Sequence, residues 1–85
     1  MLFRSRVLFV GFGETDEWAH SGRYDLVLRS AREGDGFVQQ LWNTMQALPE
    51  YRDQTTFIIT TDHGRGSGLE EWKNHGSDQK GPENI

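Results

Sequence analysis

The feature that most constrains the fold is an uncharged run that ends in potential metal ligands. Residues 55–61 read Thr-Thr-Phe-Ile-Ile-Thr-Thr, and Asp62, His63 and Gly64 follow at once. β-branched and aromatic residues without charge predict a strand that is buried on both faces. In open α/β sheets, ligands bind beyond the carboxyl ends of the strands. The run therefore predicts a strand that places Asp62 and His63 in a binding site, where their oxygen and nitrogen atoms suit zinc or manganese.

A second apolar run of strand length occupies residues 6–12, and glycine and acidic residues follow it in the same way. The residues between the two runs are numerous enough for the crossover that joins parallel strands, which is right-handed in nearly all proteins. We therefore expect residues 7–10 and 57–60 to be neighbouring parallel strands. Their polar ends would then meet at one edge of a sheet. The predicted fold class is α/β, a parallel βαβ unit followed by a polar C-terminal loop region.

The connection between the two runs has the periodicity of a helix. Its apolar residues follow the spacing of three and four that marks one helical face: Tyr24, Val27, Leu28, Ala31, Val38, Leu41, Trp42, Met45 and Leu48. The pattern keeps its phase across Gly34-Asp35-Gly36. This favours one long helix with a soft spot or kink there over two separate helices. Pro49 disfavours helical angles at the residue before it, so the helix is expected to end there.

Length and composition limit what the chain can form and bind. A chain of 85 residues with 34% hydrophobic residues buries a small core, and two strands rarely stand alone. We therefore expect residues 1–85 to be a partial domain. The net charge of −4, without a basic cluster, argues against nucleic acid as a partner. No cysteine is present, and the N-terminal apolar run has the features of neither a signal peptide nor a membrane span. Oligomeric state and compartment stay open.

A second pair of potential ligands lies near the end of the first apolar run. Asp16 and His20 are four residues apart, which places both side chains on one face of a helix or lets a loop close around an ion. The alternative is that Asp16 or Glu17 caps a helix and His20 is solvated. Parallel strands would bring this pair next to Asp62 and His63. That juxtaposition favours a metal site.

The third histidine completes one set of three ligands. Catalytic zinc commonly takes three protein ligands and leaves one position for water or substrate. Asp16, His20 and His75 would form one such set, while Asp62 and His63 would supply half of a second. The alternative is that His75 is an exposed loop histidine.

The order of these motifs resembles the alkaline phosphatase superfamily of two-metal phosphoesterases, sulfatases and phosphomutases. The resemblance rests on the apolar strand, the pair Asp16 and His20, the long helix, and the strand that ends in Thr60-Thr61-Asp62-His63-Gly64. It implies that residues 1–85 are a fragment of an alkaline phosphatase-like sandwich. It also implies one metal on Asp16, His20 and His75 and another on Asp62 and His63. The family's upstream aspartate and its Thr or Ser nucleophile have no counterpart before Asp16.

The resemblance implies part of a metal-dependent hydrolase of phosphate or sulfate esters, to which this chain contributes ligands and no nucleophile. Two divalent ions are expected in the complete enzyme, with zinc favoured and manganese or calcium as alternatives. The short spacing from His63 to His75 is more similar to phosphopentomutase and cofactor-independent phosphoglycerate mutase, so a phosphomutase is one alternative function. A non-catalytic metal-binding scaffold is another. Arg65 would bind a phosphate or sulfate oxygen of the substrate, or it is simply a solvated turn arginine.

Overall fold

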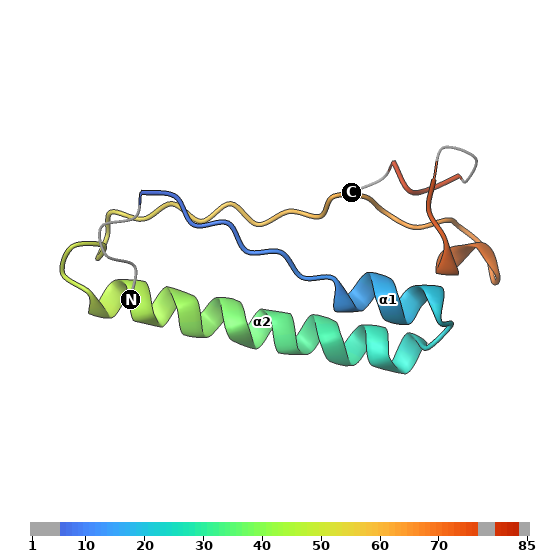
Figure 1. Ribbon diagram of the computed structural model, residues 1–85, viewed down its shortest axis with the longest axis horizontal. Coiled ribbons are helices and arrows are strands. Elements are labelled where there is room, and N and C mark those ends of the chain that lie inside the picture. The colour runs from blue at the N-terminus through green and yellow to red at the C-terminus, as the bar shows by residue number, and fades with distance from the viewer. Residues whose placement is uncertain (1–5, 77–79, 84–85) are drawn as a thin grey trace.

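The computed structural model describes residues 6–76 and 80–83. Within this part of the chain there are three helical elements, α1 (Glu14–His20), α2 (Tyr24–Ala47) and the 3-10 turn η1 (Glu71–Lys73). Figure 1 shows the short helix α1 lying antiparallel to the first half of α2, with extended chain running above both helices. The described chain is elongated, with principal extents of 48 × 24 × 17 Å.

Helix α2 confirms the prediction of one long helix. It runs for 24 residues and continues through Gly34 and Gly36. At its start, the Arg23 side chain donates two hydrogen bonds to the Asp25 carboxylate, and these bonds lower the pKa of that carboxyl. The helix ends at Ala47, and Leu48 adopts extended angles (φ −95°, ψ 118°) because Pro49 follows it.

Helix α1 forms a hairpin with α2 through a short turn. Gly22 in this turn has φ 72°, a left-handed conformation that glycine adopts without steric cost. Ala19 is 1% exposed because the small side chain lets α1 approach its neighbours closely. Asp16 and His20 both belong to α1 and are four residues apart, so their side chains lie on one face of the helix. Asp16 lies inside α1 and does not cap it.

The predicted α/β fold is wrong for the described residues, because neither apolar run forms a strand. Both runs are extended, and Figure 1 shows that they follow the same direction above α2. No backbone hydrogen bond in the described chain joins one run to the other. A ladder of two parallel strands is weak, and here only one helix is available to cover it. Phe9 is 90% and Ile58 87% exposed, so the burial that would stabilise a sheet is missing.

Aromatic pairs hold the extended runs to α2 instead. Phe12 packs edge-on against Phe37 with ring centroids 5.5 Å apart, and Phe57 packs in the same way against Trp42 at 5.3 Å. Each such pair contributes about 0.5–1.5 kcal/mol beyond its buried area. The runs are thus fixed at single points along the helix, and Val7, Phe9 and Ile58 are largely exposed.

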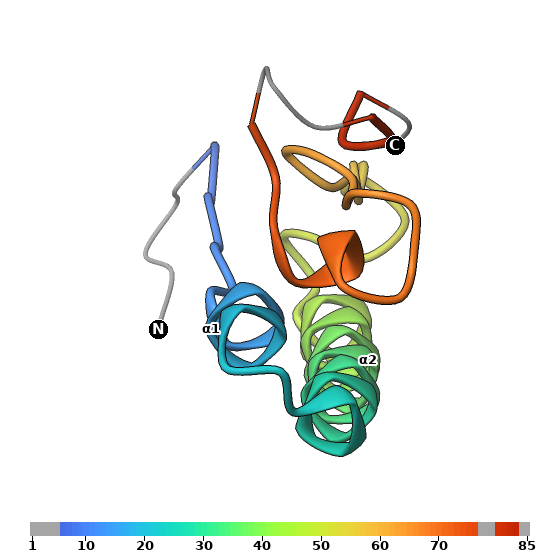
Figure 2. The same ribbon diagram turned by 90° about the vertical axis from the view of Figure 1, so that its right-hand side faces the viewer.

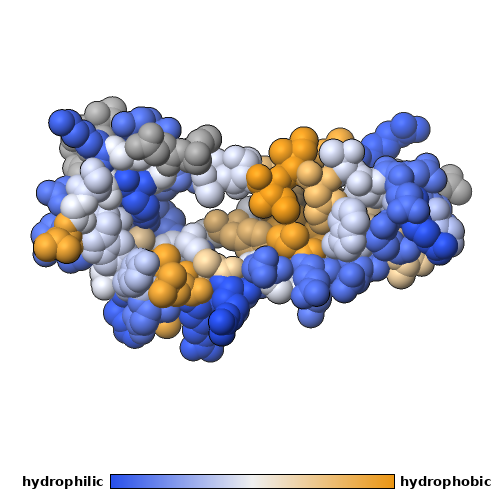
Figure 3. Space-filling model, turned by 180° about the vertical axis from the view of Figure 1, so that it is seen from behind, coloured by the Kyte–Doolittle hydropathy of each residue, from blue (hydrophilic) through white to orange (hydrophobic). Residues whose placement is uncertain are grey.

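The buried core is small as a result. Among the described residues, Ala19 and Met45 are the buried apolar side chains. Figure 3 shows the main apolar patch near the middle of the molecule, between largely hydrophilic ends. The exposed large apolar residues include Val7, Phe9, Phe12, Ile58 and Ile59. Within the described chain, neither helix combines the length and the apolar character that a bilayer crossing requires.

Candidate metal centre

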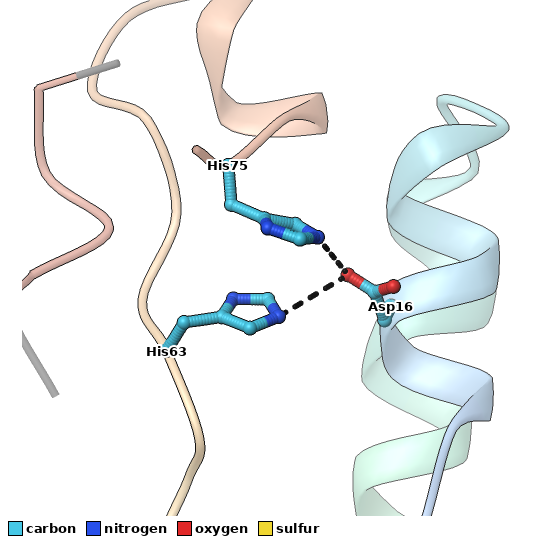
Figure 4. Close-up of side chains that lie close together, drawn as sticks. All are labelled: Asp16, His63 and His75. Atoms are coloured by element: carbon cyan, nitrogen blue, oxygen red, sulfur yellow. Dashed lines mark ion pairs between the residues drawn. The ribbon is translucent and has the colours of Figure 1, made fainter. Parts of the chain in front are cut away.

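The candidate site is centred on one carboxylate oxygen of α1. Asp16 Oδ1 lies 3.2 Å from Nε2 of His75 and 3.8 Å from Nε2 of His63. One atom from each of these three side chains lies within 4.8 Å of the other two. Figure 4 shows both imidazole rings pointing from the C-terminal loop toward Asp16. Residues far apart in the sequence therefore converge on one point.

The C-terminal loop, residues 62–76, is closed by a backbone hydrogen bond that brings the two histidines together. The Gly66 amide donates to the Asn74 carbonyl (3.0 Å), which places the segment after His63 beside the segment before His75. The two imidazole rings consequently stack, with centroids 3.7 Å apart and planes inclined by 25°. Figure 2 shows the C-terminal loop folded back over the ends of α1 and α2. The loop is thus the element that builds this half of the site.

Gly66 is required by this loop for a steric reason. A Cβ atom at position 66 would lie 2.4 Å from the carbonyl oxygen of Glu71, a distance that no real side chain tolerates. The glycine lets the chain approach η1 closely enough for the bond to Asn74. The close approach at Gly66 therefore lets the segment after His63 pair with the segment before His75.

The tautomer of His63 leaves its other nitrogen free to bind a cation. Nδ1 of His63 lies 2.8 Å from the Gly64 carbonyl oxygen, and because that oxygen can only accept, Nδ1 must carry the proton. In the neutral ring, Nε2 then presents its lone pair toward Asp16 Oδ1. Two electron-rich atoms attract each other only when a proton or a metal ion lies between them. A hydrogen bond from the other ring nitrogen to a backbone carbonyl is also the usual arrangement for a metal-binding histidine.

Two of the three distances between the ligand atoms are close to those around a zinc ion, and the third, between the two histidines, is within 4.8 Å. Ligands about 2.0–2.2 Å from a tetrahedral zinc ion lie about 3.3–3.5 Å from one another. The distances from Asp16 Oδ1 to His75 (3.2 Å) and to His63 (3.8 Å) lie on either side of that range. One carboxylate and two imidazoles form a donor set typical of zinc, with a fourth position left for water or substrate.

The structure groups the predicted ligands differently from the sequence-based sets. His63, which was assigned to a second ion, joins Asp16 and His75 in the compact group. Nε2 of His20 lies 3.4 Å from Asp16 Oδ1, one turn along α1, and its ring centroid is 5.1 Å from that of His75. The Asp62 carboxylate lies 3.7 Å from Nε2 of His63 but is 90% exposed. Asp16, His63 and His75 therefore form the compact group, His20 adjoins Asp16, and Asp62 adjoins His63.

Arg65 also binds Asp16. Its Nη2 donates to Asp16 Oδ1 (2.7 Å) and to the Asp16 backbone carbonyl (3.1 Å). Its Nη1 is buried and has no hydrogen-bond partner. Arg65 is thus neither a solvated turn arginine nor free to bind a substrate oxygen in this conformation. The sequence-based interpretation missed this ion pair because nothing in the spacing of residues 16 and 65 indicates it.

The site is partly enclosed and is accessible to ions from solvent. The side chains of Asp16, His63 and His75 are 38%, 27% and 32% exposed. An open position of this kind is typical of a centre that binds an exchangeable ion or a substrate oxygen.

No family model matches the sequence, and neither a curated protein nor a solved structure was found to match the chain.

Proposed function

We propose that this chain binds a zinc-like divalent ion through Asp16, His63 and His75. The observation that carries the proposal is the convergence of Nε2 of both histidines on Asp16 Oδ1, with Nδ1 of His63 turned to the Gly64 carbonyl. A carboxylate and a lone pair brought this close are stabilised by a cation between them. His20 and Asp62 are the adjacent side chains from which a further ligand would come.

We further propose that the bound ion serves a metal-dependent hydrolase of phosphate or sulfate esters, to which this chain supplies ligands. Support comes from the order of Asp16, His20, Asp62, His63 and His75, which resembles the alkaline phosphatase superfamily. A zinc ion with three protein ligands polarises a bound phosphoryl or sulfuryl oxygen and lowers the pKa of bound water. The chain's own residues would hold the ion beside the first turn of α1, next to the guanidinium of Arg65.

Calorimetric titration with zinc tests the binding step. The wild-type chain is expected to bind one ion, because the described residues form a single compact group of three ligands. Asp16→Asn should abolish this binding, whereas Asp35→Asn, which removes an exposed carboxylate from α2, should leave it unchanged. Equal zinc affinity of the wild type and Asp16→Asn would refute the site.

Determining the coding sequence around this segment tests the assignment to a hydrolase. Coding sequence upstream of Met1 is expected to specify an aspartate, and also a threonine, serine or cysteine at the start of a helix, because hydrolysis through a covalent intermediate needs a nucleophile beside the metal. A gene that lacks both would favour a metal-binding scaffold and contradict the hydrolase. Transfer of phosphate within a sugar phosphate by the complete protein, without release of inorganic phosphate, would instead identify a mutase.

A further inference from the structure

Asp16 Oδ1 is both the central ligand of the proposed site and the acceptor of the shortest contact from Arg65. Nη2 of Arg65 lies 2.7 Å from this oxygen, closer than any of the three histidines that surround it. Within the described chain, no hydrogen bond reaches the second carboxylate oxygen of Asp16, so the guanidinium and the metal share Oδ1. In the ion-free protein, Arg65 is the cation that neutralises Asp16.

Direct metal coordination through Oδ1 competes with the hydrogen bond from Arg65, because both use the same oxygen. A guanidinium and a divalent ion repel each other, and a carboxylate oxygen that binds zinc at about 2.0–2.2 Å has little room for a strong donor beside it. Breaking the Arg65–Asp16 pair costs part of the free energy of metal binding. Once displaced, Nη2 and the already unpartnered Nη1 form a fork of donors next to the ion.

A planar fork beside a divalent ion matches a tetrahedral oxyanion. Such a fork binds two oxygens of phosphate or sulfate, and the metal binds a third. We infer that metal binding at Asp16 and oxyanion binding at Arg65 are coupled. The metal displaces Arg65 from Asp16, and the displaced Arg65 binds the oxyanion. This inference rests on the proposed metal site and adds to it the residue that links the metal to the substrate.

Zinc titrations with and without an oxyanion test the coupling. Inorganic sulfate is the probe because zinc sulfate stays in solution, and potassium chloride at equal ionic strength controls for screening. In chloride, Arg65→Gln is expected to bind zinc about two- to fivefold more tightly than the wild type, which is the factor for removing a partly exposed ion pair. Sulfate should tighten zinc binding by the wild type by a similar factor and have no effect on Arg65→Gln.

The controls separate this inference from the proposed metal site. Arg29→Gln removes an exposed arginine that pairs with Glu33, and it should behave as the wild type does in both salts. Arg65→Met is a second charge-free variant with a long apolar stem, to be used if Arg65→Gln loses its helical circular dichroism.

Three results would overturn the coupling. The first is zinc affinity of the Arg65 variants equal to or weaker than that of the wild type, while Asp16→Asn still abolishes binding; the metal site would then stand alone. The second is tighter zinc binding by the variants without a sulfate effect in the wild type. The third is absence of zinc binding in both the wild type and the variants, which would also refute the metal site.

Discussion

Asp16 carries more of the site than any other residue, since side chains from α1, from the extended run and from both ends of the C-terminal loop contact its carboxylate. His20, His63, Arg65 and His75 all have a nitrogen within 3.8 Å of Oδ1. A single oxygen cannot satisfy four donors at once. Nη2 of Arg65 donates a hydrogen bond to this oxygen, and the tautomer of His63 leaves its Nε2 able to act as an acceptor toward a cation.

His63 and His20 should differ in their effect on zinc binding. His63→Ala removes a member of the compact group, and loss of one of three ligands should weaken zinc binding at least about 100-fold. His20→Ala removes a neighbouring ring and should weaken it less than about tenfold. Calorimetric titration of the two variants, each compared with the wild type, measures the difference. The reverse order of effects would restore the sequence-based set of Asp16, His20 and His75.

Gly66 should affect zinc affinity although it contributes no ligand. Gly66→Ala forces the new methyl group against the Glu71 carbonyl, so the loop must shift and separate the two stacked histidines. Zinc affinity should fall about tenfold or more while helical circular dichroism stays the same. Gly13→Ala is the matched control, because a methyl group there meets no atom within 4 Å. If Gly66→Ala bound zinc as the wild type does, the loop would not be what positions the ligands.

At the scale of elements, α2 contains two glycines that weaken it without serving a contact. A Cβ atom added at Gly34 or Gly36 meets nothing within 4 Å. Each Gly→Ala substitution should therefore stabilise the protein by about 0.5–1 kcal/mol through the backbone entropy of the unfolded chain. Denaturation in urea, followed by the helical signal, measures the gain in each variant and in the double variant. A loss of stability would mean that the helix needs its soft spot at this position.

The elements that were predicted correctly are those specified by local sequence. Helix α2 was predicted because its apolar spacing, the phase across Gly34 and Gly36, and the stop at Pro49 all lie within one segment. The extended runs were predicted as strands because their composition favours strands, yet a strand exists only with a partner to pair with. That partner is not specified within either run, so the pattern in residues 55–61 could not show that it is missing.

The candidate site was anticipated in its members and not in their arrangement. Residue type and spacing indicated Asp16, His20, Asp62, His63 and His75 as potential ligands. The approach of His63 to His75 and Asp16 involves the hydrogen bond from Gly66 to Asn74, a contact between two loop residues that no periodicity in the sequence indicates. The pair of Arg65 with Asp16 depends in turn on how this loop lies against α1.

For the whole molecule, a bound ion would join parts of the chain that otherwise share few contacts. An ion held by Asp16, His63 and His75 would connect α1 to the C-terminal loop, and the proposed site exists only in the folded chain. At a free zinc concentration of about 100 times the dissociation constant, the gain is about 2.7 kcal/mol. For a chain of this size, that gain should raise the melting temperature by about 10 °C or more. Differential scanning calorimetry of the wild type and of Asp16→Asn measures the rise, which should be absent from the variant.

The same experiment has a predictable pH dependence. Protons compete with metal for imidazole nitrogen, and histidine side chains in general exchange a proton near about pH 6.5. The zinc-dependent rise in melting temperature should therefore be larger at about pH 7.5 than at about pH 5.5. A rise that is equal at both values would show that imidazoles do not hold the ion.

The extended runs also have a consequence for the behaviour of many molecules together. Residues 7–10, 58 and 59 expose apolar side chains, and no backbone hydrogen bonds join the two runs within the described chain. We therefore expect the runs to act as a template on which other copies add as strands. Concentrated solutions should form fibrils that bind thioflavin. Ile59→Lys should delay fibril growth through charge repulsion, whereas Leu69→Lys, at an exposed apolar position outside these runs, should not. Solubility would then be governed by the same segments whose composition resembles that of a buried sheet.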